Sequence, residues 1–147
     1  MQERFETFTV LINRISRDIR KIKNQEMAAY RLRSIHASCL YYIYSLGSVT
    51  SAELCEHCEE DKATISRAVD YLETNGFLLR DAGAKRYKSP LLLTEKGRDT
   101  GKRIAEKIDG VLETISHALT EEERIEFYRS LSTISRSLEA IVQNSEE

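Results

Sequence analysis

The sequence predicts a mainly α-helical fold with one small β-hairpin. Three observations lead to this prediction. Between residues 50 and 94 the chain shows a helix start, a turn, a longer helix, and two short apolar segments around a polar loop. On both sides of this region, apolar residues recur at the three- and four-residue spacing of amphipathic helices. The 147 residues also include one proline and six glycines, and so few helix breakers favour long helices.

Residues 3–25 are predicted to form an amphipathic helix. Its apolar stripe consists of Phe5, Phe8, Ile12, Ile15, Ile19 and Ile22. Another helix is expected within residues 34–47, which are unusually rich in tyrosine. Because a tyrosine ring is apolar and its hydroxyl is polar, these side chains suit the cover of a core or an interface.

A short helix is predicted to begin after Thr50. Thr50 and Glu53 form a T-x-x-E capping box, in which each side chain binds the backbone N–H of the other residue. The inner side of this helix is expected to carry Leu54, Cys55 and Cys58.

Asp61 is a favourable N-cap for the next helix, over residues 62–74. The apolar stripe of this helix consists of Ile65, Ala68, Val69 and Leu72, and its other face offers Lys62, Thr64, Ser66, Arg67, Asp70 and Tyr71. Short hydroxyl side chains can approach base edges, and an arginine can bind a guanine edge bidentately, which contributes about 1–3 kcal/mol of discrimination. The partial positive charge of the helix N-terminus suits a phosphate. The face is therefore either a DNA-reading surface or an ordinary solvated one.

A β-hairpin is predicted to follow, once Gly76 has ended the helix in the left-handed conformation. Its first strand, loop and return strand are expected at residues 77–80, 81–86 and 87–93. Pro90 cannot donate to a sheet ladder, so it marks a strand edge or start. Positive charge gathers near the tip, on Lys85, Arg86 and Lys88. A ribbon of this kind can enter or straddle a minor groove, and a solvated turn is the alternative.

Two long helices are predicted after the hairpin. Thr94 caps the first, which runs to about His117 with Ile104, Ala105, Ile108, Val111, Leu112 and Ile115 facing inward. A second capping box, Thr120 with Glu123, opens the last helix. Its apolar positions are Phe127 or Tyr128, Leu131, Ile134, Leu138 and Ile141. These stripes exceed what the central region needs for cover, so they form either a monomeric bundle or a dimer interface.

The composition describes a soluble globular chain, with 41% hydrophobic and 31% charged residues, and its length suits one domain. It contains no run of about 18 apolar residues and no charged-then-apolar leader, so neither a membrane span nor a secretion signal is expected. Three cysteines, an odd number, suit a reducing cytoplasm.

The charge is unevenly distributed, although the net charge is −2. Residues 62–103 hold ten basic and five acidic side chains, whereas residues 104–147 hold four basic and ten acidic ones. Since a phosphate backbone responds to charge within about 8–10 Å at physiological salt, the local excess matters more than the total. The helix-hairpin segment is thus the expected cationic surface.

Three motifs in this segment resemble those of the MarR family of winged helix-turn-helix transcriptional regulators. They are D-K-A-T-I-S-R at 61–67, L-E-T-N-G-F at 72–77 and L-T-E-K-G-R at 93–98. The resemblance extends over nearly the whole chain, because the flanking helices come in the expected order. It implies one domain over residues 1–147, with a winged lobe at about 34–94 and dimerisation helices at about 3–25 and 95–142.

The resemblance also implies partners and sites. An obligate homodimer would bind a pseudo-palindromic double-stranded DNA operator, with residues 63–71 in the major groove and the wing in the minor groove. Ala63 joins the candidate DNA contacts on this ground, and Lys85 and Arg86 are the wing contacts. A small aromatic or phenolic effector would bind near the tyrosine-rich helix, where the candidate lining residues are Tyr30, His36 and Tyr42. The alternative is that these three side chains only cover core and interface.

The sequence departs from the family pattern at three places. Gly83 and Ala84 precede the wing cations, where the family usually has an aspartate that orients an arginine, so Asp81 is the remaining candidate for that role. Glu59 and Glu60 occupy the helix-helix turn, where a glycine and an apolar residue are usual. Cys55 replaces a small alanine.

Cys55 and Cys58 form a C-x-x-C motif with three interpretations. They are small core side chains, a redox-sensing pair, or part of a metal site. Cys39, His36 and His117 do not supply a second ligand pair at zinc-site spacing, so no metal and no cofactor are expected. Neither a nucleophile-base pair nor a phosphate-binding glycine loop is present, so an enzyme is not expected.

The sequence therefore predicts a cytoplasmic, homodimeric, sequence-specific DNA-binding regulator, most simply a repressor relieved by a small ligand. Two alternatives remain open. One is a thiol-based redox or metal-responsive regulator that uses Cys55 and Cys58. The other is a helical module whose winged lobe binds protein.

Overall fold

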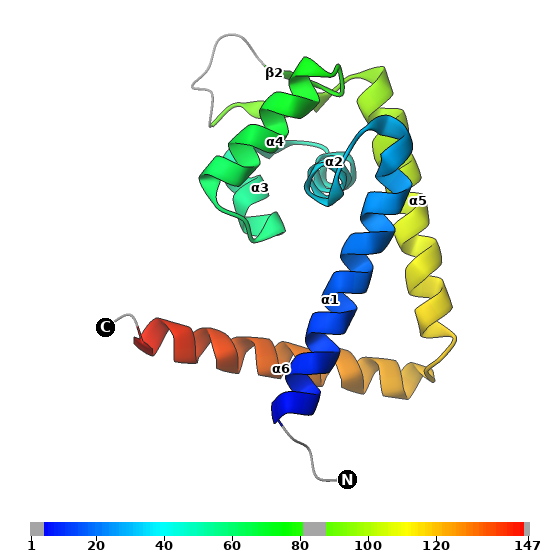
Figure 1. Ribbon diagram of the computed structural model, residues 1–147, viewed down its shortest axis with the longest axis vertical. Coiled ribbons are helices and arrows are strands. Elements are labelled where there is room, and N and C mark those ends of the chain that lie inside the picture. The colour runs from blue at the N-terminus through cyan, green and yellow to red at the C-terminus, as the bar shows by residue number, and fades with distance from the viewer. Residues whose placement is uncertain (1–4, 81–87, 146–147) are drawn as a thin grey trace. The chain divides into compact units, whose positions relative to one another are not determined.

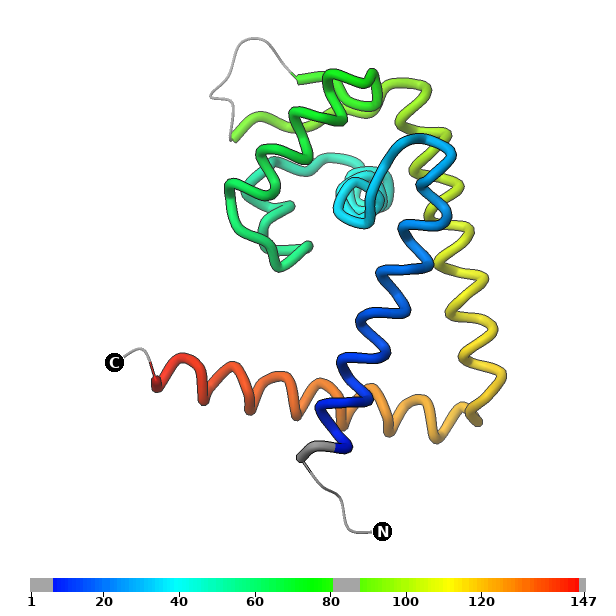
Figure 2. Tube along the Cα trace, in the orientation of Figure 1, coloured from blue at the N-terminus to red at the C-terminus, as the bar shows by residue number. Residues whose placement is uncertain are grey.

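The computed structural model describes residues 5–80 and 88–145 (Figure 1). Its contacts divide the chain between residues 106 and 107 into two compact units, which are described separately. The elements of the first unit are α1 (Phe5–Met27), the 3₁₀ turn η1 (Ala28–Tyr30), α2 (Ser34–Leu46), β1 (Val49–Thr50), α3 (Ser51–Cys58), α4 (Lys62–Thr74), β2 (Leu78–Arg80), β3 (Pro90–Leu93) and the first half of α5 (Glu95–Ser116). The second unit holds the rest of α5 and α6 (Glu121–Ser145). The predicted mainly helical class is confirmed, and Figure 2 follows the chain through these elements.

The predicted helix starts are confirmed by their caps. Thr50 Oγ1 accepts from the Glu53 N–H at 3.2 Å, and the Glu53 carboxylate accepts from the Thr50 N–H at 2.8 Å. The box at the start of α6 has the same two distances, and Thr94 Oγ1 accepts from the Gly97 N–H at 3.0 Å. The end of α4 also agrees, because Gly76 has a φ of +80°. Cap substitutions typically cost about 1 kcal/mol, so these contacts define where each helix begins.

The core of the first unit lies between α2, α3, α4 and the sheet. The stripe predicted for α4 is fully buried: Ile65, Ala68, Val69 and Leu72 are at most 3% exposed. It meets buried side chains of the other elements, including Leu40, Ile43, Leu54, Phe77 and Leu91. Each such side chain contributes about 1.5–3 kcal/mol on removal from water, which fixes the inward face of α4 and leaves its opposite face outside.

The hairpin is part of a three-stranded antiparallel sheet in the order β1-β3-β2. Leu79 pairs with Leu92 across β2 and β3, and Thr50 pairs with Pro90 across β1 and β3. The sequence analysis missed β1, because its two residues also read as the approach to a helix cap. The observed β3 begins at Pro90, consistent with a residue that has no N–H to donate.

The second unit buries little surface of its own. No residue of α6 is buried, and its exposed apolar side chains include Ile125, Leu138, Ile141 and Val142. In the first unit, α1 likewise exposes Val10, Leu11, Ile12, Ile15 and Ile19. Apolar stripes of this extent are unusual on the surface of a monomer. Among the described helices, none is both long and apolar enough to cross a membrane.

Candidate nucleic-acid interface

The outer face of α4 is available to a large partner. Lys62, Ala63, Ser66 and Arg67 are exposed, and Thr64 is half-buried. Arg67 Nη2 donates to Thr64 Oγ1 at 3.4 Å, so these two side chains lie together near the start of the helix. The predicted reading face is thus a patch of hydroxyl and guanidinium donors over the first two turns.

Asp61 fixes the N-terminus of α4. Its carboxylate accepts from the Thr64 N–H at 2.7 Å, and hydrogen bonds from the backbone and then the side chain of Thr64 lower the pKa of Asp61. The start of α4 is therefore held by a charge that remains ionised at neutral pH. This cap occupies one of the free N–H groups of the first turn.

Arg80, at the end of β2, ties the hairpin to α4. Its Nη2 lies 2.7 Å from Asp70 Oδ1, and its Nε lies 2.7 Å from Glu73 Oε2. The Arg80 side chain is only 13% exposed, so both pairs are shielded on one side. Asp70, predicted as a DNA contact, is therefore engaged in support of the hairpin. Sequence reasoning missed Arg80, although acids spaced i, i+3 on the helix and an arginine on the next strand were the available signal.

Tyr71 joins α4 to the segment before α2. Its hydroxyl donates to the Arg31 carbonyl at 2.8 Å, and its ring stacks on His36 with centroids 4.6 Å apart. His36 Nδ1 accepts from the Arg33 N–H at 2.9 Å. Burial, and then the charge of Arg33, lower the pKa of His36, so the imidazole is neutral at pH 7. Tyr71 and His36 thus act as an internal fastening, while Tyr71 stays 36% exposed.

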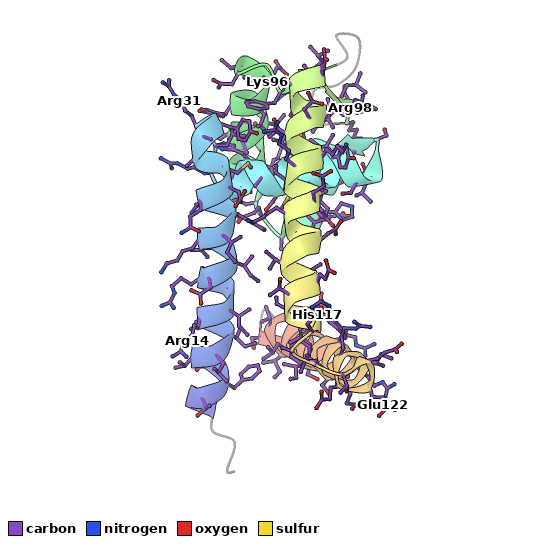
Figure 3. The ribbon with its side chains drawn as sticks, turned by 90° about the vertical axis from the view of Figure 1, so that its right-hand side faces the viewer. Arg14, Arg31, Lys96, Arg98, His117 and Glu122 are labelled. Atoms are coloured by element: carbon purple, nitrogen blue, oxygen red, sulfur yellow. The ribbon has the colours of Figure 1, made fainter. Side chains whose placement is uncertain are left out.

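The exit of α4 is fixed by the start of α5. Thr94 Oγ1 donates to the Gly76 carbonyl at 2.6 Å, and Lys96 Nζ donates to the Asn75 carbonyl at 3.0 Å. Lys96 Nζ also lies 4.2 Å from the centre of the Phe77 ring. Figure 3 shows Lys96 at the N-terminal end of α5. Gly97 packs so closely on Phe77 that a Cβ there would overlap its carbonyl oxygen.

The hairpin tip is described only in part. Lys88 is exposed and directly precedes the buried Ser89. Lys85 and Arg86, and the proposed orienting residue Asp81, lie outside the described residues. Their roles stay predictions.

The three residues predicted to line a ligand pocket lie in different places. Tyr30 accepts from Arg103 Nη1 at 2.9 Å and borders a hollow of about 420 Å³ with Lys96 and Thr100. His36 is the partner of Tyr71, and the Tyr42 ring stacks on His57 at 5.1 Å. A larger hollow of about 660 Å³ is lined by none of the three. Its walls come from α1, α2 and the end of α3, and its charged residues are Arg20, Lys23, Arg33 and Glu60.

The cysteines are arranged differently from the C-x-x-C expectation. Cys58 hydrogen-bonds Cys39 of α2, and Cys39 is fully buried. Within residues 5–80 and 88–145, no group of three or more His, Cys, Asp or Glu side chains is placed to hold a metal ion.

Comparison with known proteins agrees with this geometry. The sequence model of the MarR family matches residues 32–86, which include α2, α3, α4 and β2. The "Uncharacterized HTH-type transcriptional regulator YwoH" of Bacillus subtilis (strain 168) is 28% identical over 85 residues, and that match covers 58% of this chain. It spans 62% of the YwoH chain, which is less than two thirds of its length.

Solved structures share the fold over almost the whole chain. The S. aureus MepR-DNA complex has a TM-score of 0.80 at 19% identity and covers 93% of this chain and 99% of its own. NMB1585, a MarR family regulator from Neisseria meningitidis, has a TM-score of 0.80 at 18% identity and covers 98% and 99%.

Proposed function

The chain belongs to the MarR family, and from this premise we propose that it is a sequence-specific, double-stranded-DNA-binding transcriptional regulator. One observation carries the proposal. The face of α4 that carries Ser66 and Arg67 is exposed, while Asp61, Arg80 and Tyr71 fasten the helix at its start, along its side and near its end. A rigidly held helix with short polar side chains facing outward is what a major groove accepts.

We propose that the functional form is a homodimer. The exposed apolar residues of α1 and α6 supply faces that a second copy would cover. Two copies of α4 would then address half-sites about 34 Å apart on a pseudo-palindromic operator. A repressor role follows most simply, since a dimer bound across a promoter blocks it. Such a protein would act in the cytoplasm by binding rather than by catalysis.

A small aromatic effector is also part of the proposal. The hollow of about 660 Å³ has the size of a ligand site, and it combines isoleucines of α1 with the cations Arg20, Lys23 and Arg33. An aromatic anion would suit such walls. Stabilisation of the protein against heat by salicylate or a related phenolic acid would support this site; an unchanged melting temperature across a panel of such acids would contradict it.

The DNA-binding proposal is tested by selecting genomic fragments with the purified protein and measuring affinity by fluorescence anisotropy. Arg67→Ala should weaken specific binding by about tenfold, because a bidentate base contact is worth roughly 1–3 kcal/mol. Arg136→Ala is the matched control, since Arg136 is an exposed arginine of α6. Equal affinity of the two variants for the selected fragment would remove α4 from the reading surface.

A further inference from the structure

Two thiols from different helices are in direct contact in the first unit. Cys39, on α2, is fully buried, and Cys58, the last residue of α3, is half-buried. Their sulfur atoms share a hydrogen bond. Cys58 also lines the hollow of about 660 Å³, so one sulfur of the pair is accessible from solvent and the other lies behind it.

The surroundings give the two thiols different chemistry. The hydrogen bond from Cys39 lowers the pKa of Cys58, and the nearby ammonium of Lys23 lowers it further, against burial and the charge of Glu60. The same hydrogen bond and burial raise the pKa of Cys39. Lys23 is held in place, because its Nζ donates to Ser38 Oγ at 3.0 Å on the wall of the same hollow. The exposed thiol is therefore the better nucleophile, and the buried one stays protonated.

We propose that Cys39 and Cys58 form a reversible disulfide on reaction with a hydroperoxide, and that this bond regulates DNA binding. The second half of the proposal rests on the proposed function. In the first step, the Cys58 thiolate attacks the terminal peroxide oxygen; the O–O bond breaks, and the alkoxide leaves and takes a proton as the alcohol. This converts Cys58 to a sulfenic acid. In the second step, the Cys39 sulfur attacks the Cys58 sulfur, an S–S bond forms, and hydroxide leaves with the Cys39 proton as water. The peroxide is reduced by two electrons and the two thiols are oxidised by two.

The position of Cys58 connects this chemistry to α4. It ends α3, and only Glu59 and Glu60 separate it from Asp61, the N-cap of α4. A disulfide requires the sulfurs to approach to about 2.05 Å, closer than a hydrogen bond allows. The end of α3 must therefore move toward α2. Glu59 already holds a left-handed φ of 51°, so the short turn has little freedom to absorb that movement without shifting the start of α4.

The first test uses the whole reduced protein and cumene hydroperoxide. After treatment, titration should find two thiols lost per chain, and peptide mapping should find a single crosslink between Cys39 and Cys58 that dithiothreitol reverses. Cys55→Ser, the matched control in the same helix, should still form it. Cys58→Ser should lose no thiol pair, and Cys39→Ala should stop at a sulfenic acid that a dimedone probe traps. A Cys55–Cys58 crosslink, or irreversible oxidation of Cys58 in the intact chain, would overturn the proposal.

The second test separates this inference from the proposed function. The reduced and oxidised proteins are titrated with a duplex that the reduced protein binds, and oxidation should lower the affinity by about tenfold or more. Cys58→Ser should bind equally before and after peroxide. Unchanged affinity of the crosslinked protein would overturn the regulatory half. If the reduced protein selected no duplex, the proposed function would fail, while the crosslink result would still decide the thiol chemistry.

Lys23 gives a further readout that a purely structural role would not move. Lys23→Gln should slow dimedone-trapped oxidation of Cys58 at pH 7 and shift its rate profile to higher pH, because the thiolate loses its neighbouring cation. Ser38→Ala, which removes only the Lys23 partner, should have a smaller effect. An unshifted profile in Lys23→Gln would remove Lys23 from the proposal.

Discussion

Replacing Glu59 with glycine should stabilise the protein, although the residue is exposed and lies in a turn. Glu59 ends α3 with φ 51° and ψ 46°, the left-handed region in which a Cβ crowds the backbone. For a residue other than glycine this conformation costs roughly 1–2 kcal/mol. The family resemblance places a glycine in this turn, and the backbone supplies the physical reason.

The size of the effect follows from comparison with Glu60→Gly. Both substitutions remove one carboxylate near the start of α4, and both add the same flexibility to the unfolded chain. Glu60 has no positive φ, so only Glu59→Gly relieves backbone strain. The free energies of unfolding of the two variants should therefore differ by about 1–2 kcal/mol, with Glu59→Gly the more stable. This corresponds to roughly 2–4 °C in melting temperature per kcal/mol for a chain of this size.

Urea denaturation followed by circular dichroism measures this difference. Protein concentration must be equal in both titrations, because the stability of a dimer depends on it. The midpoints should separate while the slopes stay equal. Coincident midpoints would refute the reasoning, since they would show that Glu59 carries no backbone cost.

Three further predictions concern residues that hold the DNA lobe together. Gly97→Ala should destabilise the protein by about 2–3 kcal/mol in urea, because the added methyl overlaps the Phe77 carbonyl, whereas Gly110→Ala, with open space around it, should gain about 1 kcal/mol; similar values would contradict the packing. Arg80→Met should lower duplex affinity by about tenfold in anisotropy titrations while far-UV circular dichroism is unchanged, because the hairpin loses its two ion pairs to α4; unchanged affinity would make those pairs irrelevant to binding. For His36, whose folded pKa lies below the unfolded value of 6.5, the unfolded chain binds more protons, so stability should fall as pH drops below about 6.5; His36→Asn keeps an acceptor for the backbone and should flatten that decline, and an identical decline in both proteins would exclude His36 as its source.

Local signals allowed most of the helical architecture to be predicted. The bounds of α4 were correct because Asp61 caps its start and Gly76 follows its end. The capping boxes at Thr50 and Thr120 located two more starts, since a box is formed by residues three apart and needs no tertiary information. Strand β1 escaped because two residues carry no periodicity.

The candidate site was predictable only where exposure decides function. The exposed positions of Ser66 and Arg67 follow from the helical period, once the buried stripe is known. The use of Asp70 by Arg80, and of Tyr71 by Arg31 and His36, could not be predicted, because those partners come from other elements.

The pairing of Cys58 with Cys39 instead of Cys55 has the same cause. Spacing in the sequence suggested the nearer cysteine, whereas the packing of α2 on α3 decides which sulfur is in contact. Contacts between elements are therefore what the structure adds to the sequence.

Hydroxyl-radical footprinting on a duplex selected by the protein tests the central claim most directly. If two copies of α4 read one operator, the protected backbone should form two symmetric patches centred about 34 Å apart, and Arg67→Ala should lose both together. A single patch, or no protection at low salt with the folded protein in excess, would contradict the account.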